Sequence, residues 1–163
     1  MNRRSLFGKA HRKYKDVLVS DFSDPTYQRA FKKYCVELGL AVTDWHALFK
    51  EIDADGDTKA YIRVDERGEV IGFIQFRPET FRSRYFEETC GFVREFWVDR
   101  ECRRLGHGSE LLLLTEAYFA KQGITTCVLT VGDGARFYER RGYKKSPSLK
   151  AKNDLDVYVK RLK

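Results

Sequence analysis

The chain has 163 residues, of which 42% are hydrophobic and 14% aromatic, enough apolar material to pack one domain and too much for a disordered chain. Its 31 lysines and arginines exceed its 24 acidic residues and give a net charge of +7, and no segment is long and apolar enough to cross a membrane. These values exclude membrane-spanning and fibrous proteins and predict a soluble, cytoplasmic protein.

The predicted elements mix strands and helices along the chain. Asp24 and Pro25 give a helix its N-cap and first-turn proline, and Gly39 closes it, so we expect a helix over residues 25–38. Thr43 is expected to cap a short helix that ends at about residue 52. The predicted strands cover residues 15–20, 58–64, 70–76, 92–98, 124–131 and 155–159, and further helices are expected over about 109–123 and within 134–143.

Other segments are predicted to be connections. Residues 65–68 favour a hairpin turn, whereas the polar and aromatic residues 77–89 predict no particular form. Residues 53–57 look like the start of a calcium loop, but the glycine is misplaced and Val64 stands where the closing glutamate is needed, so a polar turn is the better interpretation. The four cysteines and three histidines show no metal-ligand spacing, which favours free thiols and no metal.

The most informative segment is the loop between the strand at 92–98 and a leucine-rich helix, with the sequence Arg103-Arg104-Leu105-Gly106-His107-Gly108. Glycines let the backbone approach a ligand closely, and a helix N-terminus offers N–H groups and partial positive charge. The loop is therefore suited to hold a diphosphate. Tight packing at a strand–helix turn is the alternative explanation for the same glycines.

A second motif, Phe137-Tyr138-Glu139-Arg140-Arg141-Gly142-Tyr143, follows about thirty residues later. The two motifs in this order resemble the GNAT superfamily of acyl-CoA-dependent N-acetyltransferases over residues 92–143. The resemblance implies an α+β domain over residues 15–163, with a mixed, mostly antiparallel sheet of six to seven strands flanked by about four helices. A basic arm is expected over residues 1–14.

The resemblance also implies site residues and acetyl-CoA as the co-substrate. Tyr138 would supply a proton to the departing thiolate, and Glu95 would accept the proton of the attacking amine. An ordinary half-buried tyrosine and an exposed strand glutamate are the alternatives. The residues expected to contact CoA are Phe96, Trp97 and Val98 through their main chain, the loop residues Arg103, Arg104, Leu105, Gly106, His107, Gly108 and Ser109, and Arg136.

The acceptor is expected to be a small-molecule or peptide amine that is attacked directly in a ternary complex, with residues 77–89 and 25–52 as the walls of its site. Basic residues cluster in the first fifteen residues and between residues 136 and 152, so a non-catalytic acyl-CoA sensor or an RNA-binding module on the same fold is the alternative. No nucleic-acid motif supports RNA binding. A homodimer is compatible with the sequence.

Overall fold

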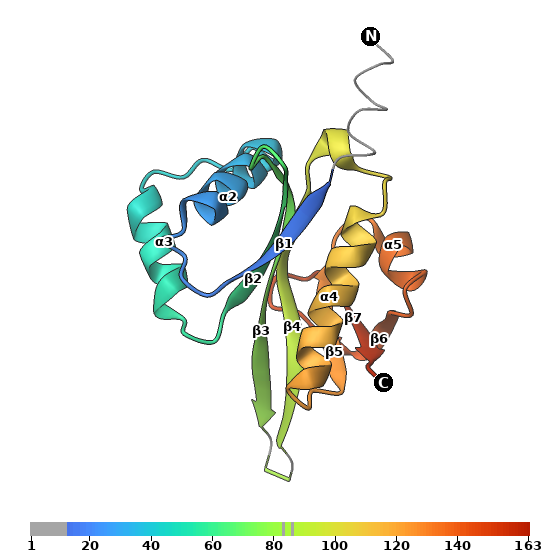
Figure 1. Ribbon diagram of the computed structural model, residues 1–163. Helices are drawn as coiled ribbons and strands as arrows, with labels where there is room; N and C mark the ends of the chain where they lie inside the picture. The colour runs from blue at the N-terminus through green and yellow to red at the C-terminus, as the bar shows by residue number, and fades with distance from the viewer. Residues whose placement is uncertain (1–12, 83, 86) are drawn as a thin grey trace. The chain divides into compact units, whose positions relative to one another are not determined.

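A computed structural model describes residues 13–82, 84–85 and 87–163 (Figure 1). Most of the expected basic arm, residues 1–12, lies outside the described residues. The elements in the described part of the chain are β1 (Tyr14–Val19), α2 (Pro25–Leu38), α3 (Trp45–Ala54), β2 (Lys59–Asp65), β3 (Val70–Arg82), β4 (Glu87–Val98), the 3₁₀ turn η1 (Arg100–Cys102), α4 (His107–Lys121), β5 (Thr126–Val131), α5 (Ala135–Glu139), β6 (Lys144–Lys150) and β7 (Asp156–Arg161).

The seven strands of the described chain form one sheet in the order β1-β2-β3-β4-β5-β7-β6. β1 pairs antiparallel with β2, and β7 pairs antiparallel with both β5 and β6. β4 and β5 pair in parallel, and α4 connects them along the chain. The predicted α+β class and the mixed, mostly antiparallel sheet are confirmed.

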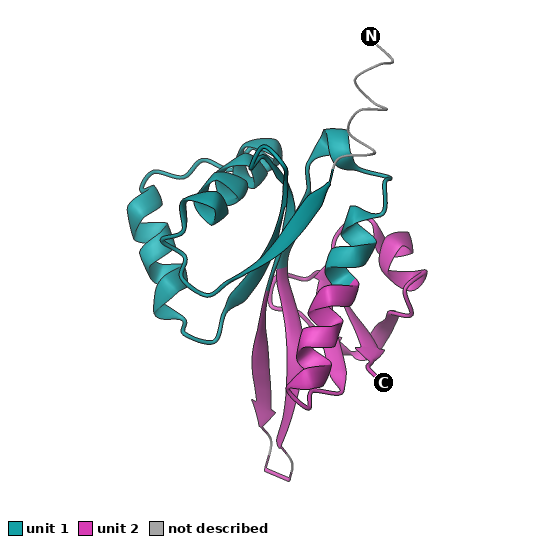
Figure 2. Ribbon diagram, viewed as in Figure 1, with its two compact units in different colours: residues 1–75, 95–112 teal, residues 76–94, 113–163 magenta. Residues whose placement is uncertain are grey.

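The chain folds into two compact units (Figure 2). Unit 1 comprises residues 1–75 and 95–112, and unit 2 comprises residues 76–94 and 113–163. Each unit has its own buried core.

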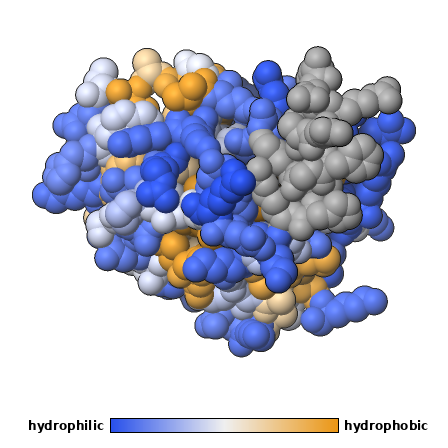
Figure 3. Space-filling model, turned by 45° about the horizontal axis from the view of Figure 1, so that its top comes forward, coloured by the Kyte–Doolittle hydropathy of each residue, from blue (hydrophilic) through white to orange (hydrophobic). Residues whose placement is uncertain are grey.

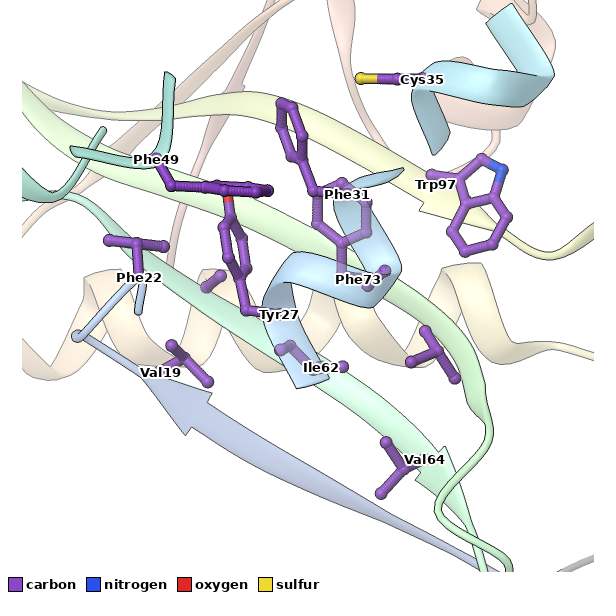
Figure 4. Packing of buried hydrophobic residues seen from close by; sticks show 13 residues of the cluster. Val19, Phe22, Tyr27, Phe31, Cys35, Phe49, Ile62, Val64, Phe73 and Trp97 are labelled. Atoms are coloured by element: carbon purple, nitrogen blue, oxygen red, sulfur yellow. The ribbon is translucent and has the colours of Figure 1, made fainter. Parts of the chain in front are cut away.

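The core of unit 1 is an aromatic cluster under α2 and α3 (Figure 4). Tyr27 and Phe31 of α2 and Phe49 of α3 pack on Phe73 of β3, with ring centroids about 6 Å apart. Side chains of β2 alternate between the faces of the sheet, so Ile62 and Val64 join this cluster while Arg63 between them points to the other face.

Helix α2 begins and ends where its sequence predicts. The Asp24 carboxylate accepts hydrogen bonds from the N–H groups of Thr26 (2.8 Å) and Tyr27 (3.1 Å), which caps the first turn. Gly39 ends the helix in the left-handed conformation, at φ 68°.

The core of unit 2 forms beneath α4. The Phe119 ring is fully buried, packs edge-on against Phe76 at 5.3 Å, and lies directly over Gly91 of β4. The buried Tyr143 hydroxyl donates to Glu116 of α4 at 2.8 Å and also lies 3.2 Å from the Cys127 sulfur of β5. Tyr143 thereby fixes the end of the α5 segment to α4 and β5.

Three elements differ from the sequence prediction. β6 is a strand that the sequence did not predict, because Lys144–Lys150 contains a proline and is almost wholly exposed. β3 and β4 are longer than expected and include residues 77–82 and 87–89, where the side chains are half-buried or exposed and show no clear apolar alternation. α4 begins at His107, two residues before the expected start.

The face seen in Figure 3 is largely hydrophilic, with hydrophobic side chains in several separate patches. None of the helices in the described residues has the length and apolar character that a bilayer span needs. The described residues also hold no group of three or more histidine, cysteine or acidic side chains placed to bind a metal. The 53–57 segment forms the polar end of α3 and the turn into β2, where Asp53 accepts a hydrogen bond from the Phe22 N–H at 3.0 Å.

Candidate functional site

The loop before α4 has the backbone conformation that its glycine predicts. Two of its residues have positive φ, Arg104 at 61° and Gly106 at 89°. Among the described residues, no atom lies within 4 Å of the position that a Cβ on Gly106 would take. The loop therefore presents open backbone at Gly106.

Helix α4 begins directly after this loop. The Glu110 N–H donates to the Gly106 carbonyl at 3.1 Å, which is the first i→i−4 hydrogen bond of the helix. The N–H groups of the first turn lie ahead of this bond and have no acceptor within the helix, as at any helix N-terminus. A helix of 15 residues directs its partial positive charge toward the same place. These residues fit a diphosphate, because both the donors and the space are present.

Arg63 binds side chains in the first turn of α4. The Arg63 guanidinium binds both carboxylate oxygens of Asp16 at 2.7 and 2.8 Å, and it also donates to Glu110. It stacks on the Tyr14 ring at 3.8 Å and lies 3.0 Å from Nδ1 of His107. We call these five side chains the Arg63 network. It joins β1 and β2 to the N-terminus of α4 through the Arg63 side chain, which is only 3% exposed.

The protonation of His107 follows from this network. A guanidinium can only donate, so Nδ1 of His107 accepts and the proton of the neutral ring belongs on Nε2. Burial and the Arg63 charge both lower the pKa of His107. Hydrogen bonds from Tyr14 and Arg63 lower the pKa of Glu110. The imidazole is thus a neutral acceptor and the carboxylate a stable anion at neutral pH.

Strand β4 leads into the loop and carries two residues that α2 binds. The Tyr34 hydroxyl of α2 donates to the Glu95 carboxylate. The Trp97 indole N–H donates to Glu37 of α2 at 2.5 Å, and its ring is buried near Phe73. The sequence did not single out Tyr34 or Glu37, which are 61 and 60 positions from their partners.

The Arg103 side chain binds other groups of the protein. Its Nε donates to the Val98 carbonyl at 2.8 Å, and its Nη2 pairs with Glu37. Glu37 therefore binds both Trp97 and Arg103, and it ties the end of β4 and the start of the loop to α2. The neighbouring Arg104 and Leu105 are exposed.

The parallel pairing of β4 with β5 is short. It comprises Gly91↔Cys127, Phe92↔Val128 and Val93↔Leu129, although β4 continues to Val98 and β5 to Val131. The residues expected to contact the thioester, Phe96 to Val98, lie on β4 beyond the last of these pairs.

Unit 2 holds Tyr138 and Arg136. Tyr138 lies on α5, edge-on to Phe137 at 5.1 Å and to Tyr143 at 6.0 Å. Burial raises the pKa of Tyr138 to about 12, so the phenol keeps its proton at neutral pH. Arg136 is exposed in the first turn of α5.

The structure therefore brings together the loop, Glu95 and Trp97 within unit 1, and Tyr138 and Arg136 within unit 2. It adds Tyr34, Glu37 and Arg63 as partners of the predicted residues. Their sequence neighbourhoods show no motif. The sequence shows only that these three are polar or charged residues within a predicted helix or strand, which is a weak signal.

Comparison with known proteins gives the same fold. A model of the acetyltransferase (GNAT) family matches residues 18–143, more than half of the chain. The curated proteins contain no match to this sequence.

Solved structures with this fold include three acetyltransferases. An acetyltransferase of the GNAT family from Staphylococcus aureus Mu50 is 15% identical at a TM-score of 0.67, over 93% of this chain and 100% of that one. Arabidopsis thaliana NAA60 in complex with acetyl-CoA is 15% identical at 0.66, over 90% and 96%. The PaiA N-acetyltransferase from Thermoplasma acidophilum in complex with coenzyme A is 18% identical at 0.62, over 90% and 99%.

The fold and the family match define an acyltransferase that uses an acyl-CoA donor. The chain belongs to the acetyltransferase (GNAT) family and is an N-acetyltransferase.

Proposed function

We propose that this protein transfers an acetyl group from acetyl-CoA to a primary amine by direct attack in a ternary complex. The observation that carries the proposal is the open, left-handed backbone at Gly106 ahead of the α4 N-terminus. The main chain of residues 103–109 would hold the diphosphate of CoA, and exposed Arg104 and Arg136 would add positive charge. CoA supplies the thioester, whose carbonyl carbon the amine attacks.

Main-chain N–H groups of Phe96 to Val98 are the proposed donors to the thioester oxygen as it gains negative charge. Losing one such donor typically costs about 3–4 kcal/mol of transition-state stabilisation. The early end of the β4–β5 pairing at Val93 supports this role, because it comes just before these residues along β4.

Tyr138 is the proposed partner of the departing sulfur. Its raised pKa of about 12 keeps the hydroxyl protonated, so the donor form is always present at neutral pH. The same shift makes the phenol a weaker acid than a thiol, whose ordinary pKa is about 8.5. We infer that the hydroxyl stabilises the sulfur by a hydrogen bond while the C–S bond breaks, with full proton transfer completed later.

Glu95 is the proposed proton acceptor for the amine, directly or through a water molecule. The hydrogen bond from Tyr34 fixes its carboxylate in one orientation. A carboxylate is a weak base for an amine of pKa about 10, so its task is to accept the proton as the C–N bond forms.

Three of the four cysteine thiols are buried, which argues against these three as carriers of the acyl group, whereas Cys102 before the loop is half-buried. Burial raises the pKa values of Cys35 and Cys90, and it raises that of Cys127 to about 12. A thiol that keeps its proton is a poor nucleophile.

The test follows thiol release from acetyl-CoA with a panel of amines, alongside calorimetric binding of acetyl-CoA. Tyr138→Phe should lower kcat about a hundredfold or more and leave acetyl-CoA affinity unchanged. Gly106→Glu should abolish acetyl-CoA binding, because it places a charged side chain in the proposed diphosphate position and strains the backbone.

Gly123→Glu is the matched control. Gly123 also has positive φ, at 77°, with open space at its Cβ position, but it follows the far end of α4. Equal acetyl-CoA affinity for Gly106→Glu and Gly123→Glu would contradict the proposed binding loop. Acetyl-CoA binding without release by any amine, or salt-dependent retention of RNA, would favour the non-catalytic alternatives.

A further inference from the structure

Unit 2 contains an apolar pocket of about 400 Å³ whose lining comes from five strands and the β6–β7 connection. Its apolar lining includes Phe81 of β3, Phe92 of β4, Val128 of β5, Val157 of β7 and Leu149 of β6. Phe81 and Leu149 are each 48% exposed. Large apolar side chains left open around a hollow mark a place where a ligand is bound.

The pocket lies on the sheet face opposite α4 and α5. Gly91 meets the Phe119 ring of α4, and Cys127 meets the Tyr143 hydroxyl, so these two residues face the helices. Phe92 and Val128 are the next residues along the two strands and form a pair in the ladder. Because neighbouring residues of a strand point to opposite faces, Phe92 and Val128 line the pocket from the other side.

The pocket reaches the place where the β4–β5 pairing ends. The pair Phe92↔Val128 directly precedes the last pair, Val93↔Leu129, and Thr130 just beyond it also lines the pocket. Under the proposed function, which this inference deepens and on which it rests, the proposed main-chain donors to the thioester oxygen follow this point along β4.

The rim of the pocket carries positive charge. Lys150 at the end of β6 and Lys152 in the β6–β7 connection line it, and both are exposed. Glu79 also lines it, but Glu79 is bound to Arg77 at 3.1 Å. The two lysines therefore set the charge that a ligand meets at the rim, and they suit an anionic group.

We propose that the pocket is the acceptor site and that the acceptor is a free α-amino acid with an aromatic or branched apolar side chain. The side chain occupies the apolar lining, the carboxylate faces Lys150 and Lys152, and the α-amino group points to the thioester. The amino group, after losing a proton to solvent, attacks the carbonyl carbon. The C–N bond forms, the C–S bond breaks, the nitrogen gives up its second proton and the sulfur gains one.

The first test compares acceptors that differ in one group each. The whole protein is assayed with saturating acetyl-CoA and L-phenylalanine, L-leucine, L-alanine, phenylalaninamide or phenylethylamine. We expect kcat/KM to fall about tenfold or more from phenylalanine to alanine, which lacks the apolar body. We expect a similar fall to the amide and to phenylethylamine, which lack the carboxylate.

The second test alters the pocket. Lys150→Ala/Lys152→Ala should raise the KM for phenylalanine roughly fivefold or more, without changing the KM for acetyl-CoA. Lys144→Ala is the matched control, an exposed lysine of β6 outside the pocket. Ala151→Trp should fill the pocket and abolish transfer to phenylalanine while acetyl-CoA still binds.

The outcomes separate this inference from the proposed function. Thiol release with other amines but none with apolar amino acids overturns the acceptor class and leaves the acetyltransferase proposal standing. Equal rates with phenylalanine and phenylethylamine, or an unchanged KM in the lysine variant, also overturn it. Failure of acetyl-CoA to bind overturns the proposed function itself.

Discussion

Tyr34 and Glu95 form a pair in which one hydroxyl sets the orientation of one carboxylate. Glu95→Gln should lower kcat/KM about a hundredfold, because it removes the proton acceptor for the amine. Tyr34→Phe should lower it less, roughly three- to tenfold, because the carboxylate remains but loses its fixed position. Both changes are measured by thiol release, and the KM for acetyl-CoA should not move in either.

Glu88→Gln is the control for that pair, since Glu88 lies on the same strand and accepts from Thr126 at 3.3 Å. Wild-type activity in Glu95→Gln would remove Glu95 from the reaction and leave it as a partner of Tyr34 alone.

Gly72 lies where two strands come unusually close. A Cβ on Gly72 would lie 2.6 Å from the Trp97 carbonyl oxygen and 3.1 Å from the Val98 Cα, both backbone atoms that cannot turn aside. Gly72→Ala should therefore lower the free energy of unfolding by about 1–3 kcal/mol, measured by urea denaturation followed by circular dichroism. Gly56→Ala, where a Cβ meets no described atom within 4 Å, should be neutral or slightly stabilising. Equal effects would show that β3 and β4 can move apart.

At the residue level, the sequence predicted the residues that belong to a motif but not the residues that form hydrogen bonds with them. Gly106 and the helix start after it were predicted, because glycine and a leucine-rich helix leave a local pattern. Arg63 was missed because it binds His107 from 44 positions away, and nothing local distinguishes it from other charged strand residues. The His107 ring also has a structural task, the contact with Arg63, which the sequence did not predict.

The elements β1, β2 and α4 meet in the Arg63 network, beneath the proposed diphosphate loop. Arg63→Lys keeps the charge but cannot bind Asp16 through two nitrogens while also reaching His107. We expect acetyl-CoA binding to weaken about tenfold, with kcat at saturation largely retained, because the first turn of α4 loses its fixed position. Calorimetry and the KM for acetyl-CoA measure this.

Arg67→Lys in the exposed β2–β3 turn is the control. Unchanged acetyl-CoA affinity in Arg63→Lys would limit the network to a role in folding. A lower kcat with unchanged KM for acetyl-CoA would indicate that Arg63 affects the transfer step and not the binding of acetyl-CoA.

Elements with capping residues at their ends, or with one buried apolar face, could be predicted from the sequence. α2 has an aspartate cap, a proline and a closing glycine, and its predicted bounds are confirmed at both ends. β6 offers neither, because Lys144–Lys150 is stabilised by pairing with β7 at the edge of the sheet and not by burial of its own side chains. The outer parts of β3 and β4 escaped prediction for the same reason.

At the scale of the whole molecule, acid should destabilise the fold through the Arg63 network. The folded-state pKa of His107 lies below its usual value, so below about pH 6.5 the unfolded chain binds a proton that the folded chain does not. The pKa of Glu110 is also lowered, which adds a loss of stability as the pH falls through its usual range near 4.5. Both effects have the same sign, so stability should decrease steadily from pH 7.5 to pH 4.

Urea midpoints by circular dichroism at pH 7.5, 6 and 5 measure this. His107→Gln should flatten the decrease above pH 5, and His46→Gln, a change at an exposed histidine of α3, should not. A midpoint that stays constant from pH 7.5 to pH 5 in the wild-type protein would contradict the assignment of His107 as a neutral acceptor.

The two tryptophans of the chain, Trp45 and Trp97, both belong to unit 1. Glu37 links the Trp97 indole to Arg103 at the start of the loop. If the nucleotide of CoA binds the proposed loop, we expect the hydrogen bond of this indole and its fluorescence to change, while the fluorescence of Trp45 on α3 stays the same. Trp97 would then be an intrinsic fluorescent reporter of donor binding, and Trp45→Phe would isolate its signal for stopped-flow work without any attached dye.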